Sequence, residues 1–391
     1  MSHYEAINVS ESINPEVKNR MFSFEIVPQV SLYDSVAAFS QALELGEKDL
    51  IITNQFIFDP FIKPLDLPCS VIFQEQYGSG EPTDVMIDQV KAVADQKAYD
   101  RVIAIGGGTV IDIGKVLVLD GQWTTADLFE RKAPIQKTRK LIVVPTTCGT
   151  GSEVTSITIV GMTQKKTKLG LNARELYPDM AVLIPDMLHT LPYKFFATSS
   201  IDALIHAVES YVSPKANPYN ELFGVKAMEL IIAGYKKIRS QGQSAWIQDA
   251  KEYLLASNFA GIAFNNAGVG AVHAMSYPLG GEYHIAHGEA NHLMFTEVFK
   301  TYHSKKPDGR IRKLEEILAY YLECDINNVW QEMETLLDAV LHKKALREYG
   351  IEAEILPAIA VGVIETQQRL LANNYVELTA EEMTEIYQRL Y

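Results

Sequence analysis

The spacing of apolar residues predicts that the first half of the chain alternates between buried strands and helices. Five short runs, rich in β-branched residues, have the length of buried strands. These runs lie at residues 49–53, 70–73, 101–105, 141–144 and 181–184. Between two of them, a helix is predicted to begin at Pro82, because Val85, Met86, Val90 and Val93 recur at helical spacing. This alternation is typical of an α/β domain with a doubly wound, mostly parallel sheet.

Beyond Pro192 the apolar period changes and stays helical to the C-terminus. Residues 222–232 and 311–321, for example, repeat their apolar positions every three or four residues. The second half is therefore predicted to be all-helical. A chain of 391 residues is long enough for two cores, and we place the boundary near residue 190, which gives domains of residues 1–190 and 191–391.

Charge and cysteine content narrow the function classes. The net charge of -14, with no dense stripe of Lys and Arg, argues against nucleic-acid and membrane partners. Three widely spaced cysteines support neither a disulfide framework nor a thiolate metal site. The N-terminus carries Glu5, Glu11, Glu16 and Lys18 where a signal peptide needs an apolar core. We therefore expect a cytoplasmic protein.

A glycine turn follows the predicted strand at 101–105. Gly106, Gly107 and Gly108 come directly before a helical segment, so their backbone N–H groups can approach a pyrophosphate at the helix N-terminus. Thr109 is predicted to cap that helix and donate its hydroxyl. Three glycines alone can equally make a tight turn, and the spacing differs from the common G-x-G-x-x-G fingerprint.

A second loop, at residues 145–155, is rich in hydroxyl groups and glycine. It follows the predicted strand at 141–144. Because ligands bind beyond the carboxyl ends of parallel strands, its side chains are suited to hydrogen-bonding a ribose or a phosphate. Loops of Ser, Thr and Gly are common, so this one alone is weak evidence.

Four side chains in the helical half form a candidate metal site. Asp202 and His206 have i, i+4 spacing, which puts both on one face of a helix. His273 and His287 can complete a shell of three nitrogens and one oxygen, which suits Fe²⁺ or Zn²⁺. An Asp/His pair at this spacing is more often a packing pair than a metal site, so spacing alone does not decide.

The motifs together resemble the iron-containing (group III) alcohol dehydrogenase family. The matching segments, in order, are GGGTVIDIGK, PTTCGTGSEVT, DALIHAVESYVS and HAMSYPLGGEYHIAHG. The resemblance runs from about residue 25 to the C-terminus. It implies a dehydroquinate synthase-like fold, with a dinucleotide-binding domain in residues 1–190 and a metal-binding domain in 191–391. The family's metal ligands correspond to Asp202, His206, His273 and His287.

The resemblance also implies where a dinucleotide binds. With the glycine turn and the hydroxyl-rich loop, it leads us to expect cofactor contacts from Asn54, Gly106, Gly107, Gly108, Thr109, Asp112, Thr146, Thr147, Ser152, Thr155 and Lys168. Family members often have Asp after the second strand, where this chain has Asn54. No Arg or Lys follows it in residues 55–58, which favours NAD over NADP.

One departure concerns the catalytic groups. Many family members carry a second histidine four residues after His273, where this chain has Tyr277. Tyr277 is predicted to orient the substrate and His284 to relay protons, although a packing role is an equal alternative for each.

The resemblance extends to a substrate. Segments such as LPYKFFATSSIDALIHAVESYVSPKANPY and QQRLLANNY imply the reversible, NAD-dependent reduction of succinate semialdehyde to 4-hydroxybutyrate, with Fe²⁺ or, alternatively, Zn²⁺. The alternatives are an alcohol dehydrogenase for short neutral primary alcohols or diols, and a non-catalytic metal- and dinucleotide-binding sensor. A related fold that cyclises sugars matches the motifs less well. We expect a small-molecule aldehyde or alcohol as ligand and a homo-oligomer, with a dimer favoured.

Overall fold

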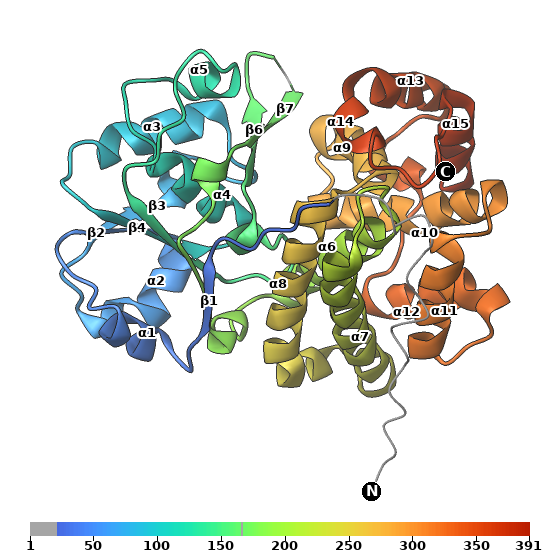
Figure 1. The fold of residues 1–391 in the computed structure, drawn as a ribbon, viewed down its shortest axis with the longest axis horizontal. Helices are drawn as coiled ribbons and strands as arrows, with labels where there is room; N and C mark the ends of the chain where they lie inside the picture. The colour runs from blue at the N-terminus through green and yellow to red at the C-terminus, as the bar shows by residue number, and fades with distance from the viewer. Residues whose placement is uncertain (1–21, 166) are drawn as a thin grey trace, which may run out of the picture.

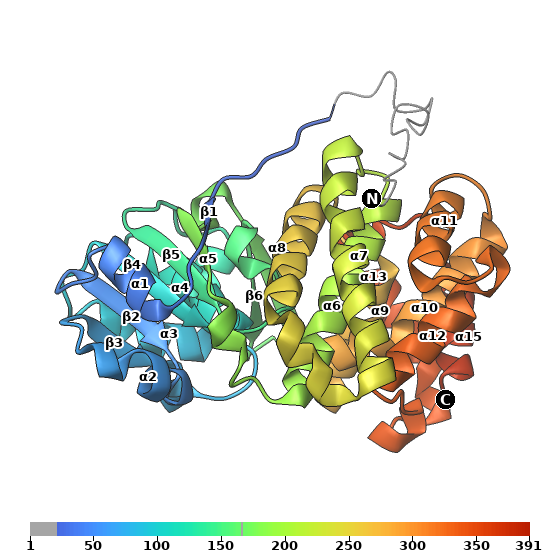
Figure 2. The same cartoon turned by 90° about the horizontal axis from the view of Figure 1, so that it is seen from below.

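The computed structural model describes residues 22–165 and 167–391. The charged N-terminal residues Glu5, Glu11, Glu16 and Lys18 therefore lie outside the described residues. The described chain has an α/β part and a helical part that lie side by side along the longest axis (Figure 1). In the second view the helix α8 (Ala250–Ala267) runs along the side of the helical part that faces the sheet (Figure 2).

The α/β part is built on a six-stranded sheet in the order β1-β8-β5-β4-β2-β3. Every neighbouring pair in it is parallel. The strands are β1 (Gln29–Leu32), β2 (Asp49–Thr53), β3 (Ser70–Phe73), β4 (Arg101–Gly106), β5 (Lys140–Pro145) and β8 (Met180–Leu183). The five predicted strands are confirmed as β2, β3, β4, β5 and β8, with ends that agree to within one residue.

Helices cover both faces of this sheet. Val102 and Ala104 of β4 pack into a core with α3 and α4, whereas Ile103 and Ile105 pack into a second core with α1 and α2. Successive side chains of a strand point to opposite faces, so one strand contributes to both cores. The helices are α1 (Val36–Ala42), α2 (Gln55–Phe61), α3 (Asp84–Ala94), α4 (Gly108–Leu117) and α5 (Thr125–Phe129). The doubly wound α/β fold is thus confirmed.

Three strands were absent from the sequence prediction. β1 is short and lies at the edge of the sheet, and its residues are mostly exposed. β6 (Ile157–Met162) and β7 (Thr167–Asn172) form a separate antiparallel pair. This pair stands beside α4 and α5 at the side of the α/β part that faces the helices (Figure 1).

The second half is helical throughout, as predicted. Its α-helices are α6 (Tyr193–Val212), α7 (Pro218–Gln241), α8, α9 (Ala271–Tyr283), α10 (His287–Lys305), α11 (Arg310–Leu322), α12 (Val329–Val340), α13 (Leu356–Thr366), α14 (Gln368–Leu371) and α15 (Ala380–Arg389). The core of this half surrounds α6, whose residues from Ser200 to Val212 are all buried. No helix in the described residues is long and apolar enough to cross a membrane.

Short 3-10 helices connect many of these elements. They are η3 (Lys63–Leu65), η4 (Gln74–Tyr77), η5 (Ser152–Val154), η6 (Arg174–Leu176), η7 (Pro185–Leu188), η8 (Gln243–Asp249), η9 (Ile326–Asn328), η10 (Leu346–Tyr349) and η11 (Ala353–Ile355). The segment between β8 and α6 contains η7 and the predicted boundary near residue 190. The division into two domains at that point stays a prediction.

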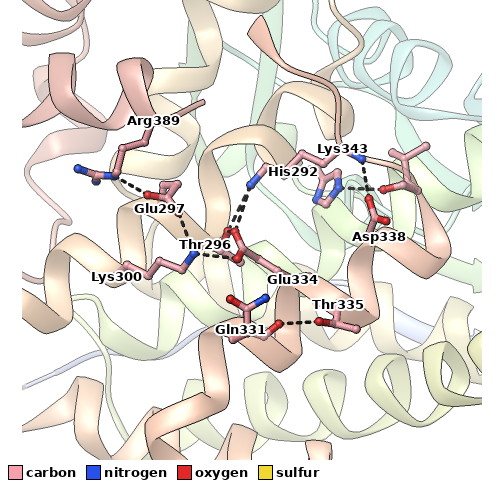
Figure 3. A network of polar contacts seen from close by, with 11 residues as sticks. His292, Thr296, Glu297, Lys300, Gln331, Glu334, Thr335, Asp338, Lys343 and Arg389 are labelled. Carbon is pink, nitrogen blue, oxygen red and sulfur yellow. Dashed lines mark hydrogen bonds and ion pairs between the residues drawn. The ribbon is translucent and has the colours of Figure 1, made fainter. Parts of the chain in front are cut away.

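A polar network fixes α10 against its neighbours. Glu334 of α12 accepts hydrogen bonds from Thr296 at 2.7 Å and from Lys300 at 2.8 Å, both on α10. Glu297 of α10 pairs with Arg389 of α15 at 2.5 Å (Figure 3). Such linked ion pairs add geometric specificity to the apolar packing. They hold in place the helix that begins at His287, one of the predicted metal ligands.

Candidate functional site

A cavity of about 400 Å³ lies between the α/β part and the helices. Side chains from both parts line it. The predicted site residues among them are Gly108, Thr109, Asp112, Thr147, Ser152, Thr155, Lys168, Asp202, His206, His273, Tyr277 and His287. The structure thus brings the predicted cofactor segment and the predicted metal segment to one site.

The four predicted metal ligands converge on one point of this cavity. α6 presents Asp202 and His206 one turn apart, His273 is in the first turn of α9, and His287 begins α10. The distances from Asp202 Oδ1 to the Nε2 atoms of His206, His273 and His287 are 3.9, 3.5 and 3.7 Å.

The distances between these ligand atoms fit four ligands that share one cation better than they fit direct hydrogen bonds between the side chains. Four ligands at about 2.0 to 2.2 Å from a tetrahedral ion lie about 3.3 to 3.6 Å apart, close to the observed values. Asp202, His206 and His273 are all buried, and His273 Nε2 has no hydrogen-bond partner among the described residues. A buried nitrogen without a partner is costly unless a ligand satisfies it. The donor set fits Fe²⁺ or Zn²⁺.

The electrostatics of the four groups also favour positive charge at their centre. Burial raises the pKa of Asp202, but the nearby rings of His206, His287 and His273 outweigh burial and lower it below its ordinary value. Burial lowers the pKa of His273, yet the carboxylates of Asp202 and Glu209 beside the ring raise it to about 9. Burial lowers the pKa of His206 to about 3, so this ring is a neutral donor at neutral pH.

Glu209 supports one of these ligands and was missed in the sequence. It lies on α6, is buried, and its Oε2 is 2.5 Å from His273 Nδ1. Its other oxygen accepts a hydrogen bond from the Val272 backbone N–H at 2.8 Å. A carboxylate at Nδ1 fixes the tautomer with a free lone pair on Nε2, the arrangement that a metal-ligating histidine needs. Glu209 lies seven residues after Asp202, a helical spacing that could have signalled this role.

Asn291 is a second supporting residue that the sequence reading missed. Its Nδ2 donates to Asp202 Oδ1 at 2.7 Å and lies 3.2 Å from His287 Nε2. The start of α10 reaches α6 because residue 288 is glycine, since a Cβ there would lie 2.0 Å from the Thr198 carbonyl oxygen. This close approach puts His287 and Asn291 beside Asp202.

The glycine turn lies at the N-terminus of α4, as predicted, but the cap differs. Gly107 occupies the N-cap position, and no side chain caps the helix. The prediction that Thr109 caps it is wrong, because Thr109 is already inside the first turn. Its hydroxyl donates instead to the Gly80 carbonyl at 2.9 Å. The free N–H groups at this end remain suited to an anion.

Behind the turn, Lys115 organises residues that line the cavity. Its buried ammonium donates to Ser152 Oγ at 2.6 Å, to Thr155 Oγ1 at 2.9 Å and to the Ile157 carbonyl at 2.6 Å. Burial lowers its pKa to about 8. Ser152 in turn donates to Asp112 Oδ1 at 2.7 Å. Ser152, Thr155 and Asp112 are predicted from the sequence as cofactor contacts, but the lysine that fixes their positions was not predicted.

The hydroxyl-rich loop is held against the helical half. Gly151 has φ of +56°, and a Cβ there would lie 2.4 Å from Gly261 Cα on α8. Only glycine tolerates both this conformation and this approach. This contact joins the loop after β5 to α8. The two backbones are so close at this point that no side chain fits between them.

Five predicted site residues do not line the cavity: Asn54, Gly106, Gly107, Thr146 and His284. Asn54 directly follows β2, and it donates to Gln74 at 3.1 Å and to Glu75 at 2.9 Å. Glu75 therefore places a carboxylate next to Asn54, the neutral amide that follows β2. His284 is exposed and caps α9 with φ of +55°, so its proton-relay role stays an untested prediction.

Tyr277, Lys168 and Arg369 form the part of the cavity next to His287. The Tyr277 ring centroid is 6.0 Å from that of His287, and Lys168 Nζ is 5.9 Å from the Tyr277 ring. Lys168 pairs with Glu81 at 2.5 Å. Arg369 also lines the cavity and was not predicted from the sequence.

Comparison with known proteins places the chain among metal-dependent oxidoreductases. The family model "Iron-containing alcohol dehydrogenase" matches residues 30–185, and "Fe-containing alcohol dehydrogenase family, C-terminal" matches residues 196–391. The chain is 48% identical over 367 residues to the 4-hydroxybutyrate dehydrogenase of Clostridium kluyveri, covering 94% of this chain and 99% of the relative. It is 32% identical to long-chain-alcohol dehydrogenase 1 of Geobacillus thermodenitrificans, covering 89% and 90% of the two chains.

Solved structures share the fold. Sulfoacetaldehyde reductase from Bifidobacterium kashiwanohense, in complex with NAD⁺, superimposes with a TM-score of 0.83 at 21% identity and covers 95% of this chain and 99% of its own. A 1,3-propanediol oxidoreductase has a TM-score of 0.81 at 22% identity, with 95% and 100% covered. At these identities the likeness bears on architecture, and the predicted two-part architecture is confirmed.

Proposed function

The chain belongs to the iron-containing alcohol dehydrogenase family, and from this premise we propose that it catalyses the reversible, NAD-dependent reduction of succinate semialdehyde to 4-hydroxybutyrate. The observation that carries the chemistry is the convergence of Asp202 with three histidines inside the cavity that the glycine turn also borders. The substrate rests on the 48% identity to a 4-hydroxybutyrate dehydrogenase over nearly the whole of both chains.

We propose Asp202, His206, His273 and His287 as the ligands of the metal. When bound, the metal supplies a Lewis acid for a carbonyl oxygen, and the nicotinamide supplies or accepts a hydride. Glu209 would keep His273 in the tautomer with a free Nε2, and Asn291 would orient Asp202 and His287. With these groups held by buried hydrogen bonds, little reorganisation is needed during the reaction.

For the substrate side, we propose that Tyr277 orients the reacting oxygen. Burial raises the pKa of Tyr277, so its hydroxyl stays protonated at neutral pH and can donate a hydrogen bond. The ring lies beside His287, which puts this donor next to the proposed metal site. The hydroxyls of Thr147, Ser152 and Thr155 are proposed contacts of the dinucleotide.

NAD is the proposed cofactor. Glu75 lies beside Asn54 and accepts a hydrogen bond from the Gln55 backbone N–H at 2.6 Å. If the adenosine ribose binds at this turn, the carboxylate would repel a 2′-phosphate. A cytoplasmic location and a homodimer are also proposals.

A combined assay of metal content and kinetics tests the function. Protein purified without added chelator is expected to contain iron or zinc near one equivalent per chain, and to oxidise NADH faster with succinate semialdehyde than with butyraldehyde. Equal kcat/KM values for the two aldehydes would reject the named substrate and favour an alcohol dehydrogenase for short neutral primary alcohols or diols. Absence of NADH oxidation with any aldehyde would reject an enzyme and favour the sensor.

A further inference from the structure

The cavity holds two cationic side chains with different surroundings. Lys168, on β7, is mostly buried and already pairs with Glu81 at 2.5 Å. Arg369, on α14, is exposed, and no carboxylate in the described part of the chain forms an ion pair with it. A guanidinium that faces a ligand cavity without a carboxylate partner is available to bind an anion from solution.

Arg369 is close to the proposed reaction centre. Its side chain interacts with Tyr277, whose ring is 6.0 Å from the His287 ring, and His287 Nε2 is 3.7 Å from Asp202 Oδ1. Tyr277 is thus a neighbour of both the guanidinium and a proposed metal ligand. On the other side, Arg369 Nη2 is 3.7 Å from the Cβ position of Gly170 on β7.

This arrangement matches a short molecule with an anion at one end. In an extended four-carbon chain, the aldehyde oxygen and the carboxylate lie about 5 to 6 Å apart, as ordinary bond lengths of about 1.5 Å require. A molecule of this length has its anion close to its reacting end, and Arg369 and His287 are likewise both neighbours of one side chain, Tyr277. A neutral aldehyde of equal length would fill the same space but leave the guanidinium without a partner.

We propose that Arg369 binds the substrate carboxylate and selects ω-carboxylated aldehydes over neutral ones, an inference that rests on the proposed function. The planar guanidinium can form two parallel hydrogen bonds to a carboxylate. The net charge of -14 gives the molecule a field unfavourable to anions, so binding an anionic substrate requires such a local donor. Lys168, held by Glu81, is a weaker candidate for this role.

The test compares succinate semialdehyde with butyraldehyde in matched variants. Arg369→Gln is expected to lower the kcat/KM ratio of the two aldehydes by about 10- to 150-fold, the range for one charge-assisted hydrogen-bonded pair. The loss should appear chiefly as a higher KM for succinate semialdehyde, because the guanidinium contacts the end of the substrate that does not react. Arg369→Lys should lose less than Arg369→Gln, since it keeps the charge without the fork.

Arg347→Gln is the matched control, because Arg347 is an exposed arginine of η10 that does not line the cavity. It should keep the wild-type ratio. A binding measurement adds a readout that does not depend on turnover. Titrating butyrate into the enzyme–NADH complex, followed by nicotinamide fluorescence, should give a Kd for Arg369→Gln that is about 10- to 150-fold higher than the wild-type Kd.

The outcomes separate the two proposals. A wild-type ratio near one would overturn the named substrate itself. A wild-type ratio well above one that stays unchanged in Arg369→Gln would overturn the role of Arg369 alone. Equal losses with both aldehydes in Arg369→Gln would likewise overturn it, because they would mean that Arg369 only supports the fold. A loss of the ratio in Lys168→Met but not in Arg369→Gln would assign the carboxylate to Lys168 instead.

Discussion

Glu209 offers a sharp test of the metal site, because it contacts a proposed ligand without lining the cavity. Its carboxylate accepts one hydrogen bond from His273 Nδ1 and another from the Val272 backbone N–H. In Glu209→Gln one of these two acceptors becomes an NH₂ donor. If the NH₂ of the amide faces Val272, it meets the Val272 backbone N–H, and two donors then face each other in a buried site. If the NH₂ faces His273 instead, Nδ1 must accept and Nε2 must carry the proton.

Either arrangement weakens metal binding, because the first costs a buried hydrogen bond and the second removes the lone pair that His273 offers. Loss of a hydrogen bond to a metal-ligating histidine typically lowers metal affinity about 10- to 100-fold, which equals about 1.4 to 2.7 kcal/mol. We expect a loss in that range for Glu209→Gln.

The assay is a titration of the metal-free protein with Fe²⁺ under anaerobic conditions, in competition with a chromogenic chelator, and then with Zn²⁺. Glu315→Gln is the matched control. Glu315 is equally buried and also contacts a histidine, with Oε1 2.8 Å from His303 Nδ1 and from Trp330 Nε1, but it does not line the cavity. Equal metal affinities for wild type and folded Glu209→Gln would refute the assignment of His273 as a ligand fixed by Glu209.

Three further predictions follow from the site. Chelators should inactivate the wild type, and Fe²⁺ added anaerobically should restore activity, since four protein donors are left without an ion; full activity in verified metal-free protein would contradict this. Gln55→Arg should raise the NADPH:NADH ratio of kcat/KM by up to about 10-fold, and more when combined with Glu75→Gln; an unchanged ratio would mean that the ribose binds elsewhere. Lys115 has a folded pKa of about 8 against 10.5 ordinarily, so the unfolded state binds more protons between these values and wild-type stability rises with pH there. Relative to Lys115→Met, the unfolding free energy of the wild type should increase by roughly 3 kcal/mol from pH 8 to 10.5, and parallel pH profiles in denaturant titrations would contradict it.

The sequence alone determined the elements and chemistry that depend on short stretches of chain. The strands at 49–53 and 70–73 were predicted with their observed ends, because a buried strand is marked by a local apolar run. Asp202 and His206 were paired correctly because a helix brings residues four apart to one face. The glycine turn was located because it directly follows its strand.

Only the tertiary structure decided which distant side chains meet. Glu209 reaches His273 across 64 residues and Asn291 reaches Asp202 across 89, and Arg369 enters the cavity from a helix near the C-terminus. The tertiary structure also leaves His284 exposed and brings Glu75 next to Asn54. Local spacing carries no information on these contacts, because they arise from the packing of whole helices and strands, and buried polar groups find their partners only within that packing.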